Sequence, residues 1–340
     1  MNKKIVFLLV LVSLIAGVHA QKIDKSFVLN GSINIDSGTI LLMPVVDTLF
    51  YPPNLQTETV IKNGRFEFTG SSSSPHLFRL GLRINNRWKY ISSIFFIDPI
   101  EQKIVCNVDS IREVPEITNK SMTELGHYNS FTRGKQNDSL LYDYVNENSN
   151  SYVGLWQLIM KLSSGYKPFY TTIFDRFSTS IRNSPLGLTL KNRLYVLSNV
   201  ATGKTFPQLV LLDEKKRKQI VPGNISNNKY TFIDFWFSHC TPCIAQFDQL
   251  KQIYKRFNKD GFGMMAISVD GKKDEKEWRR VIAEYKLPWL QYWDVGSVES
   301  AKISVSEFHS NFLLDANGVI IARNIEPSYL ESFLLAHCYK

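Results

Sequence analysis

Residues 230–243 read YTFIDFWFSHCTPC and decide the fold of this part of the chain. The apolar run at their start predicts a buried strand, and Pro242 with the spaced apolar residues after it predicts an amphipathic helix. Cys240 then lies at the helix N-terminus, where unpaired N–H groups and the helix dipole favour a thiolate by roughly 0.3–2 kcal/mol. Two residues separate it from Cys243, which is close enough to close a disulfide. The pair predicts a dithiol/disulfide couple in which Cys240 attacks and Cys243 resolves.

The order of Asp234, Cys240 and Cys243 resembles the thioredoxin superfamily, specifically its exported TlpA/ResA-type branch. The resemblance covers roughly residues 203–340 and includes a late hairpin with the tight turn Asn317-Gly318. It implies an α/β thioredoxin-like domain, which is a mixed sheet with helices on both faces. It also implies that Asp234 exchanges a proton with Cys243. The position of Asp234 inside an apolar run predicts burial, and burial raises the pKa of a carboxyl group.

The substrate groove is expected beside the dithiol, at Trp236, His239, Phe308 and His309. Thioredoxin-like proteins carry a cis-proline just before the late strand, and here His309 stands at that position. A non-proline cis bond costs about 2.5–4 kcal/mol, so the Phe308–His309 bond is expected to be trans. An imidazole there can stabilise the Cys240 thiolate, or it can join His239 and the thiols in a Zn(II) or Cu(I) site. Otherwise the alignment slips at this point, or His309 is simply tolerated.

Other interpretations of the cysteine pair stay open. A structural zinc site needs about four ligands, and the chain has no second cysteine pair at metal spacing. An inert structural disulfide needs neither the strand-to-helix corner nor the buried acid. A peroxiredoxin-like peroxidase needs a proline and a hydroxyl residue at set spacings, which the stretch before Cys240 lacks. The last alternative is a non-enzymatic protein whose thioredoxin fold binds a metal or a partner.

Residues 1–20 predict a cleaved secretory signal peptide. A basic start is followed by an apolar run over residues 5–18 and by the small-residue site VHA at 18–20. The apolar run is shorter than the roughly 18 residues of a membrane span, and an uncleaved anchor is the alternative. The mature chain is expected to begin near Gln21 in a periplasmic or otherwise extracytoplasmic space, without membrane association.

Composition narrows the class of protein further. The net charge is +9 over 340 residues, and it is spread along the chain. The basic cluster at 215–218 indicates a solvated loop, so no nucleic-acid partner is expected. Four cysteines are too few for a disulfide-built scaffold. Cys106 and Cys338 are expected as buried or idle thiols, although the sequence leaves open that they pair.

The chain divides into three regions after the signal peptide. Residues 21–118 show short alternating apolar runs separated by turn signals such as Asn63-Gly64, which predict a β-rich domain resembling a sandwich. This region is similar to a β-rich domain of unknown function that precedes TlpA-like domains in Bacteroidetes-type exported proteins. Residues 119–202 show helical spacing and predict a helical connector, and residues 203–340 form the thioredoxin-like domain.

These patterns predict an exported thiol:disulfide oxidoreductase that acts as a reductant of protein disulfides. Its partners are then protein thiol or disulfide substrates and an electron-donor protein that the sequence does not identify. The resemblance implies no organic cofactor and no metal in the reaction. The redox direction stays open, because the Thr241-Pro242 dipeptide does not determine the reduction potential.

Overall fold

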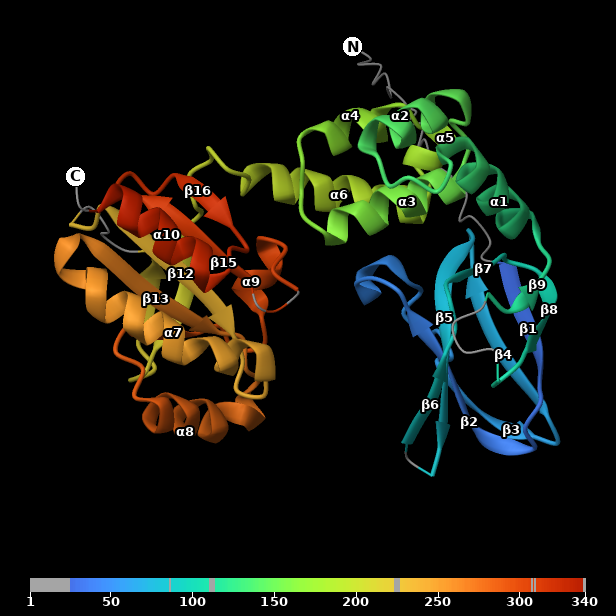
Figure 1. Cartoon of the computed structure of the whole chain (residues 1–340), viewed down its shortest axis with the longest axis horizontal. Coiled ribbons are helices and arrows are strands. Elements are labelled where there is room, and N and C mark those ends of the chain that lie inside the picture. Colours follow the sequence, from blue (N-terminus) through green and yellow to red (C-terminus); the bar gives the residue numbers. More distant parts are fainter. Residues whose placement is uncertain are drawn as a thin grey trace, which may run out of the picture.

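The computed structural model describes residues 25–85, 87–109, 114–222, 227–306, 308 and 310–338. The predicted signal peptide at 1–20 and His309 lie outside these residues. In Figure 1, a β-rich domain and an α/β domain lie at opposite ends of the molecule, and a group of helices joins them. None of the helices in the described ranges is long and apolar enough to span a membrane.

Several strands of the β-rich domain, such as those over residues 65–72 and 101–106, alternate between buried and exposed side chains. The strands of this domain are β1 (Lys25–Ile33), β2 (Ser37–Pro44), β3 (Glu58–Lys62), β4 (Arg65–Ser72), β5 (His76–Ile84), β6 (Arg87–Ile91), β7 (Phe95–Ile97), β8 (Glu101–Cys106) and β9 (Glu116–Ile117), with the 3-10 helix η1 at Thr48–Phe50. In β4, Phe66 and Phe68 are buried while their neighbours face solvent. Asn63 and Gly64 close the β3–β4 hairpin with φ angles of 50° and 71°, the left-handed geometry that a two-residue hairpin loop requires.

Hydrogen bonds join the described strands of this domain in a single sheet. Their order is β6-β5-β2-β3-β4-β1-β8-β9, with β7 paired to β5. Strand β1 pairs antiparallel with β4 and parallel with β8. The predicted β-rich domain is confirmed, and its described strands form one continuous hydrogen-bonded sheet. Periodicity predicts which face of a strand is buried, but it does not predict which strands share hydrogen bonds.

The helical connector packs directly on this sheet. Its helices within the described residues are α1 (Lys120–Thr132), α2 (Asp138–Glu147), α3 (Tyr152–Ser163), α4 (Phe169–Asp175), α5 (Thr179–Arg182) and α6 (Pro185–Asn199). Helix α4 ends at Asp175, and α5 begins separately because the Ser178 side chain accepts a hydrogen bond from the N–H of Ile181. Helices and strands share one apolar core, and Trp156 Nε1 donates to the Pro75 carbonyl at 2.9 Å. The connector and the β-rich domain thus form one packed unit.

The C-terminal domain contains a mixed sheet. Its strands are β10 (Leu209–Asp213), β11 (Lys218–Val221), β12 (Tyr230–Trp236), β13 (Phe262–Ser268), β14 (Leu290–Trp293), β15 (Ser310–Asp315) and β16 (Ile320–Arg323), in the order β11-β10-β14-β13-β12-β15-β16. Strands β12, β13 and β14 run parallel, and β15 lies antiparallel to β12. The predicted mixed sheet is confirmed. The β10–β11 hairpin was missed, and the basic cluster at 215–218 lies exposed at its turn.

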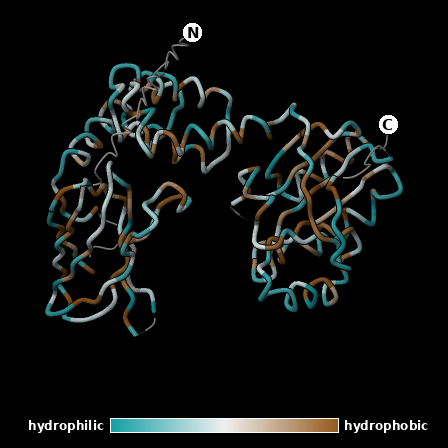
Figure 2. Tube along the Cα trace, turned by 180° about the vertical axis from the view of Figure 1, so that it is seen from behind, coloured by the Kyte–Doolittle hydropathy of each residue, from teal (hydrophilic) through white to brown (hydrophobic). Residues whose placement is uncertain are grey.

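Helices cover both faces of this sheet. They are α7 (Thr241–Phe257), α8 (Glu275–Tyr285), α9 (Val298–Lys302) and α10 (Pro327–His337), with short 3-10 turns at Asn258–Asp260 and Lys272–Asp274. Side chains of α7, α8 and α10 form one apolar cluster with the sheet, and the segments after α6 and α9 contribute to a second cluster on the other face. Figure 2 shows hydrophobic colours through the middle of the domain and hydrophilic colours along its outer loops.

Two cysteines lie away from the strand-to-helix corner. Cys106 is buried in the core of the β-rich domain, and Cys338 is buried in the C-terminal domain. Both are free thiols, which confirms the expectation of buried, unpaired cysteines. Burial raises the pKa of the Cys106 thiol to about 12, so this thiol is inert at neutral pH.

Candidate active site

Cys240 and Cys243 lie where β12 passes into α7. Cys240 is the N-cap of α7, and its Sγ accepts a hydrogen bond from the backbone N–H of Cys243 at 3.2 Å. The two cysteines form a disulfide, with their Cα atoms 5.3 Å apart. Pro242 fits the first helical turn because the N–H groups there have no intrahelical partner. Each cysteine is only 3% exposed, so the oxidised pair is almost fully buried.

Asp234 lies under this corner, inside β12. Asp234 is 3% exposed. Because side chains alternate between the two faces of a strand, it lies on the same face of the sheet as Phe232 and Trp236. That face forms the apolar cluster that also contains Cys240 and Cys243. Burial raises the pKa of the Asp234 carboxyl to about 8. The acid therefore holds a proton at neutral pH and can release it close to that pH.

A second buried polar group lies in the same row of the sheet. The register places Asp234 opposite Ala266 of β13, and Ala266 opposite Gln291 of β14. Residues paired in this way share one face of the sheet. Both amide atoms of Gln291 are buried and have no hydrogen-bond partner in the described part of the chain. The sequence contained a weak signal for it, a polar residue between Trp289 and Trp293 on the buried side of the strand.

Asp270 holds the segment that leads into Cys240. Its carboxylate accepts hydrogen bonds from the Ser238 N–H at 3.0 and 3.1 Å and from the Ser238 hydroxyl at 2.7 Å. The Ser268 hydroxyl donates to the same carboxylate at 2.7 Å. These buried, charge-assisted bonds fix the backbone two residues before the first cysteine. Sequence reasoning missed Asp270, which lies after the neighbouring strand β13.

The residues expected to line a substrate groove lie in different surroundings. Trp236 is fully buried, and its ring packs edge-on against Phe247, 5.2 Å between centroids, so it supports the corner from the core. His239 is exposed, and its Nε2 lies 3.7 Å from Asp274 Oδ1. Phe308 is half-buried. His309 lies outside the described residues, so the Phe308–His309 bond is not described.

Two aromatic rings lie beside the corner. Phe308 packs edge-on against Phe237, with the ring centroids 5.2 Å apart. Phe237 is also half-buried and stands three residues before Cys240. Within the described residues, no three His, Cys, Asp or Glu side chains lie close enough together to hold a metal ion. The arrangement consists of a helix-capping disulfide, a buried acid beneath it and an aromatic pair beside it.

Comparisons with known proteins agree with this arrangement. A family model described as thioredoxin-like matches residues 227–320. The chain is 28% identical over 137 residues to the thiol-disulfide oxidoreductase ResA of Bacillus subtilis, which covers 40% of this chain and 74% of that protein. It is 24% identical over 123 residues to ResA of Bacillus cereus, covering 36% of this chain and 69% of that protein.

This chain is also similar to a solved structure of a thiol-disulfide oxidoreductase from Bacteroides fragilis, with 29% sequence identity and a TM-score of 0.36. The similar region covers 39% of this chain and 98% of the Bacteroides fragilis chain. These two ResA matches each cover less than half of this chain, and the family model lies within the C-terminal domain. The C-terminal domain is therefore similar to thioredoxin-like domains, and the chain has relatives named thiol-disulfide oxidoreductases.

Proposed function

We propose that this protein is an exported thiol:disulfide oxidoreductase that reduces disulfides in substrate proteins through Cys240 and Cys243. The observation that carries the proposal is the Cys240–Cys243 disulfide at the N-terminus of α7. Helix N-terminal N–H groups stabilise a thiolate on Cys240 when the pair is reduced. The half-buried rings of Phe237 and Phe308 offer an apolar surface for a substrate chain beside it.

The reaction transfers two electrons from the dithiol to the substrate. The Cys240 thiolate attacks one sulfur of the substrate disulfide, a mixed disulfide forms, and the other substrate sulfur leaves as a thiolate. Cys243 then loses its proton and attacks Cys240 Sγ. The Cys240–Cys243 bond forms, and the second substrate thiolate leaves. Each released thiolate takes up a proton, so the substrate is reduced to two thiols and the pair is oxidised.

Asp234 is the group that we assign to the proton of Cys243. With a pKa of about 8, roughly one molecule in ten carries the ionised carboxylate at pH 7. That fraction can accept the Cys243 proton during resolution. In the reverse direction, the protonated acid can supply a proton to the departing Cys243 thiolate when an electron-donor thiol protein reduces the pair.

Export supports this direction of electron flow. The signal-like sequence at 1–20 directs the chain to a compartment in which disulfides persist, where a dithiol reductant has substrates. Mass spectrometry of the protein recovered from its host tests this part directly. A mature N-terminus near Gln21 is expected, and a full-length chain in the cytoplasm would contradict export.

Trapping of mixed disulfides tests the roles of the two cysteines. Cys243→Ser should accumulate substrate proteins on Cys240, because attack proceeds and the resolving thiol is gone. Cys240→Ser should trap none, and Cys338→Ser, which changes a buried free thiol, should behave as wild type. Insulin reduction with dithiothreitol should be fast only for wild type and Cys338→Ser. Equal trapping by both active-site variants on non-reducing gels would contradict the assignment.

A further inference from the structure

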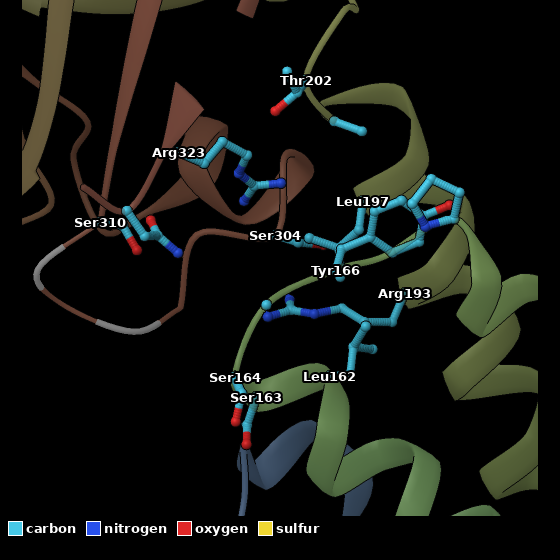
Figure 3. A pocket seen from close by; sticks show the side chains of 14 residues that line it. Leu162, Ser163, Ser164, Tyr166, Arg193, Leu197, Thr202, Ser304, Ser310 and Arg323 are labelled. Carbon is cyan, nitrogen blue, oxygen red and sulfur yellow. The ribbon is translucent and has the colours of Figure 1, made fainter. Parts of the chain in front are cut away.

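A pocket of about 410 Å3 lies where the helical connector meets the C-terminal domain (Figure 3). The connector contributes the end of α3 with the loop after it, the inner side of α6 and the segment that follows α6. The C-terminal domain contributes Ser304 after α9, the first residue of β15, and the end of β16 with the residue that follows it. Neither cysteine of the disulfide lines the pocket, so it is separate from the candidate active site.

Main-chain hydrogen bonds hold the two sides of the pocket together. The Gly203 N–H donates to the Ile320 carbonyl at 2.8 Å, and the Ile320 N–H donates to the Lys204 carbonyl at 2.8 Å. The Phe206 N–H donates to the Gly318 carbonyl at 2.9 Å. The segment after α6 is therefore attached to the β15–β16 hairpin through backbone contacts, and the pocket lies against this joint.

The lining of the pocket is positively charged. Arg193 extends from α6 and Arg323 from β16, on opposite walls (Figure 3). Among the described residues that line it there is no aspartate or glutamate. The other polar groups are neutral, namely the Asn324 amide and the hydroxyls of Ser163, Ser164, Tyr166, Thr202, Ser304 and Ser310. Two guanidinium groups thus border a space whose other polar lining groups are neutral, and Asp47, the acidic partner of Arg193, lies outside the lining.

Arg323 is held firmly in this position. Its guanidinium lies over the ring of Phe312, 4.6 Å from the centroid, and Nη1 donates to the Val200 carbonyl at 3.2 Å. Its Nε is buried and has no hydrogen-bond partner among the described residues. Burial and the charge of Arg193 lower the pKa of Arg323 to about 10, so the group is still charged at neutral pH. A half-buried cation facing a like charge is unfavourable until an anion neutralises it.

Arg193 is oriented from outside the pocket. Its Nη2 donates to the Ser306 hydroxyl at 2.9 Å and lies 3.7 Å from Asp47 Oδ2, which belongs to the β-rich domain. Asp47 is not part of the lining. Contacts from two domains therefore set the direction of Arg193.

We propose that this pocket binds a small organic molecule through an oxyanion, a phosphate or a carboxylate, held between Arg193 and Arg323. Guanidinium groups bind such oxyanions through paired N–H donors. The volume lies in the range of roughly 300–1,000 Å3 that is usual for small-molecule sites, well above the space that a bare ion fills. The remainder of the ligand lies against the hydroxyl groups. This site does not depend on the thiol chemistry.

Binding of defined anions to the oxidised full-length protein tests the proposal. Inorganic phosphate and succinate are titrated separately at constant ionic strength, with sodium chloride as the reference, and affinity is measured by calorimetry and by the melting temperature. Saturable binding of either anion is expected. Preference for one anion identifies whether the oxyanion is a phosphate or a carboxylate. Melting curves that follow ionic strength alone, with no heat of binding, would overturn the proposal.

Arginine variants locate the binding to this pocket. Arg193→Gln and Arg323→Gln should each weaken the anion by about tenfold or more, because each removes a charged donor pair. Arg79→Gln, an exposed arginine on β5, should bind as wild type. Arg323→Lys keeps the charge and loses the forked geometry, so an intermediate affinity is expected even if the glutamine variant folds poorly. Wild-type affinity in both pocket variants would refute the site.

Discussion

Replacing Asp234 with asparagine tests the buried acid, because the amide is nearly isosteric and carries no proton in this pH range. The carboxyl is buried on the cysteine side of the sheet, and burial raises its pKa to about 8. In the unfolded chain the pKa is about 3.9. Between these values the folded protein keeps a proton that the unfolded chain has released. Stability therefore falls as pH rises from about 4 to about 8, and it levels off above that.

The size of the effect follows from the same two values. Each pH unit between them changes the free energy of unfolding by about 1.4 kcal/mol, so wild type loses about 4 kcal/mol from this group between pH 4 and pH 7. The Asp234→Asn variant has no carboxyl group at this position, so its free energy of unfolding does not fall for this reason. The difference in stability between variant and wild type should move by about 4 kcal/mol in favour of the variant over this interval. Total stabilities are only about 5–15 kcal/mol, so denaturant unfolding can resolve it.

The same substitution should lower the disulfide-reductase activity, although it raises the relative stability. Insulin reduction is measured with dithiothreitol at pH 6, 7, 8 and 9, and the variant should be slower by about tenfold or more, because general acid–base transfer is lost. Wild type should show an inflection near pH 8 that the variant lacks. The control is Asp98→Asn, which replaces a buried acid of the β-rich domain and should keep wild-type rates. Equal rates across this range, with parallel stability curves, would reduce Asp234 to a structural residue.

Other substitutions test the surroundings of the disulfide. Asp270→Asn should lower the free energy of unfolding by roughly 1–3 kcal/mol, because it weakens three hydrogen bonds from Ser238. Denaturant unfolding measures this loss, with Ser238→Ala as the comparison variant. Gln291→Leu should raise stability by about 1–3 kcal/mol at constant pH, since it removes a buried amide without a partner in the described residues, and a loss instead would indicate a bound water. His309→Pro should raise insulin-reduction activity and lower metal retention in a chelator titration, and wild-type values in both would make His309 a bystander.

Local patterns were sufficient for several elements in both the β-rich and the C-terminal domain. The apolar run of β12, the helix-starting proline and the Asn63-Gly64 turn each determine structure over a few neighbouring residues, so they could be predicted. The break after Asp175 depends on one capping hydrogen bond of Ser178, which periodicity does not reveal. The single sheet of the β-rich domain depends on pairing between distant strands, such as β1 with β8. No periodicity within a single strand encodes that pairing.

The residues of the candidate site also fall into two groups, those that the sequence predicted and those that it did not. Cys240, Cys243 and Asp234 lie within ten residues of one another, and strand alternation places the acid on the cysteine side. Asp270 and Gln291 reach the site only through the parallel pairing of β12, β13 and β14. Their contribution depends on register, and register is set by the packed sheet as a whole.

The two-arginine pocket shares one segment with the disulfide corner. Ser304 and Ser310 line the pocket, and between them Phe308 packs on Phe237, three residues before Cys240. An anion that binds the oxidised and the reduced protein with different affinities must also change the redox equilibrium, because binding couplings are reciprocal. A tenfold difference in anion affinity between the two redox forms corresponds to about 30 mV in the reduction potential of the pair. Equal affinity in both forms would make the pocket and the dithiol energetically independent, despite the shared segment.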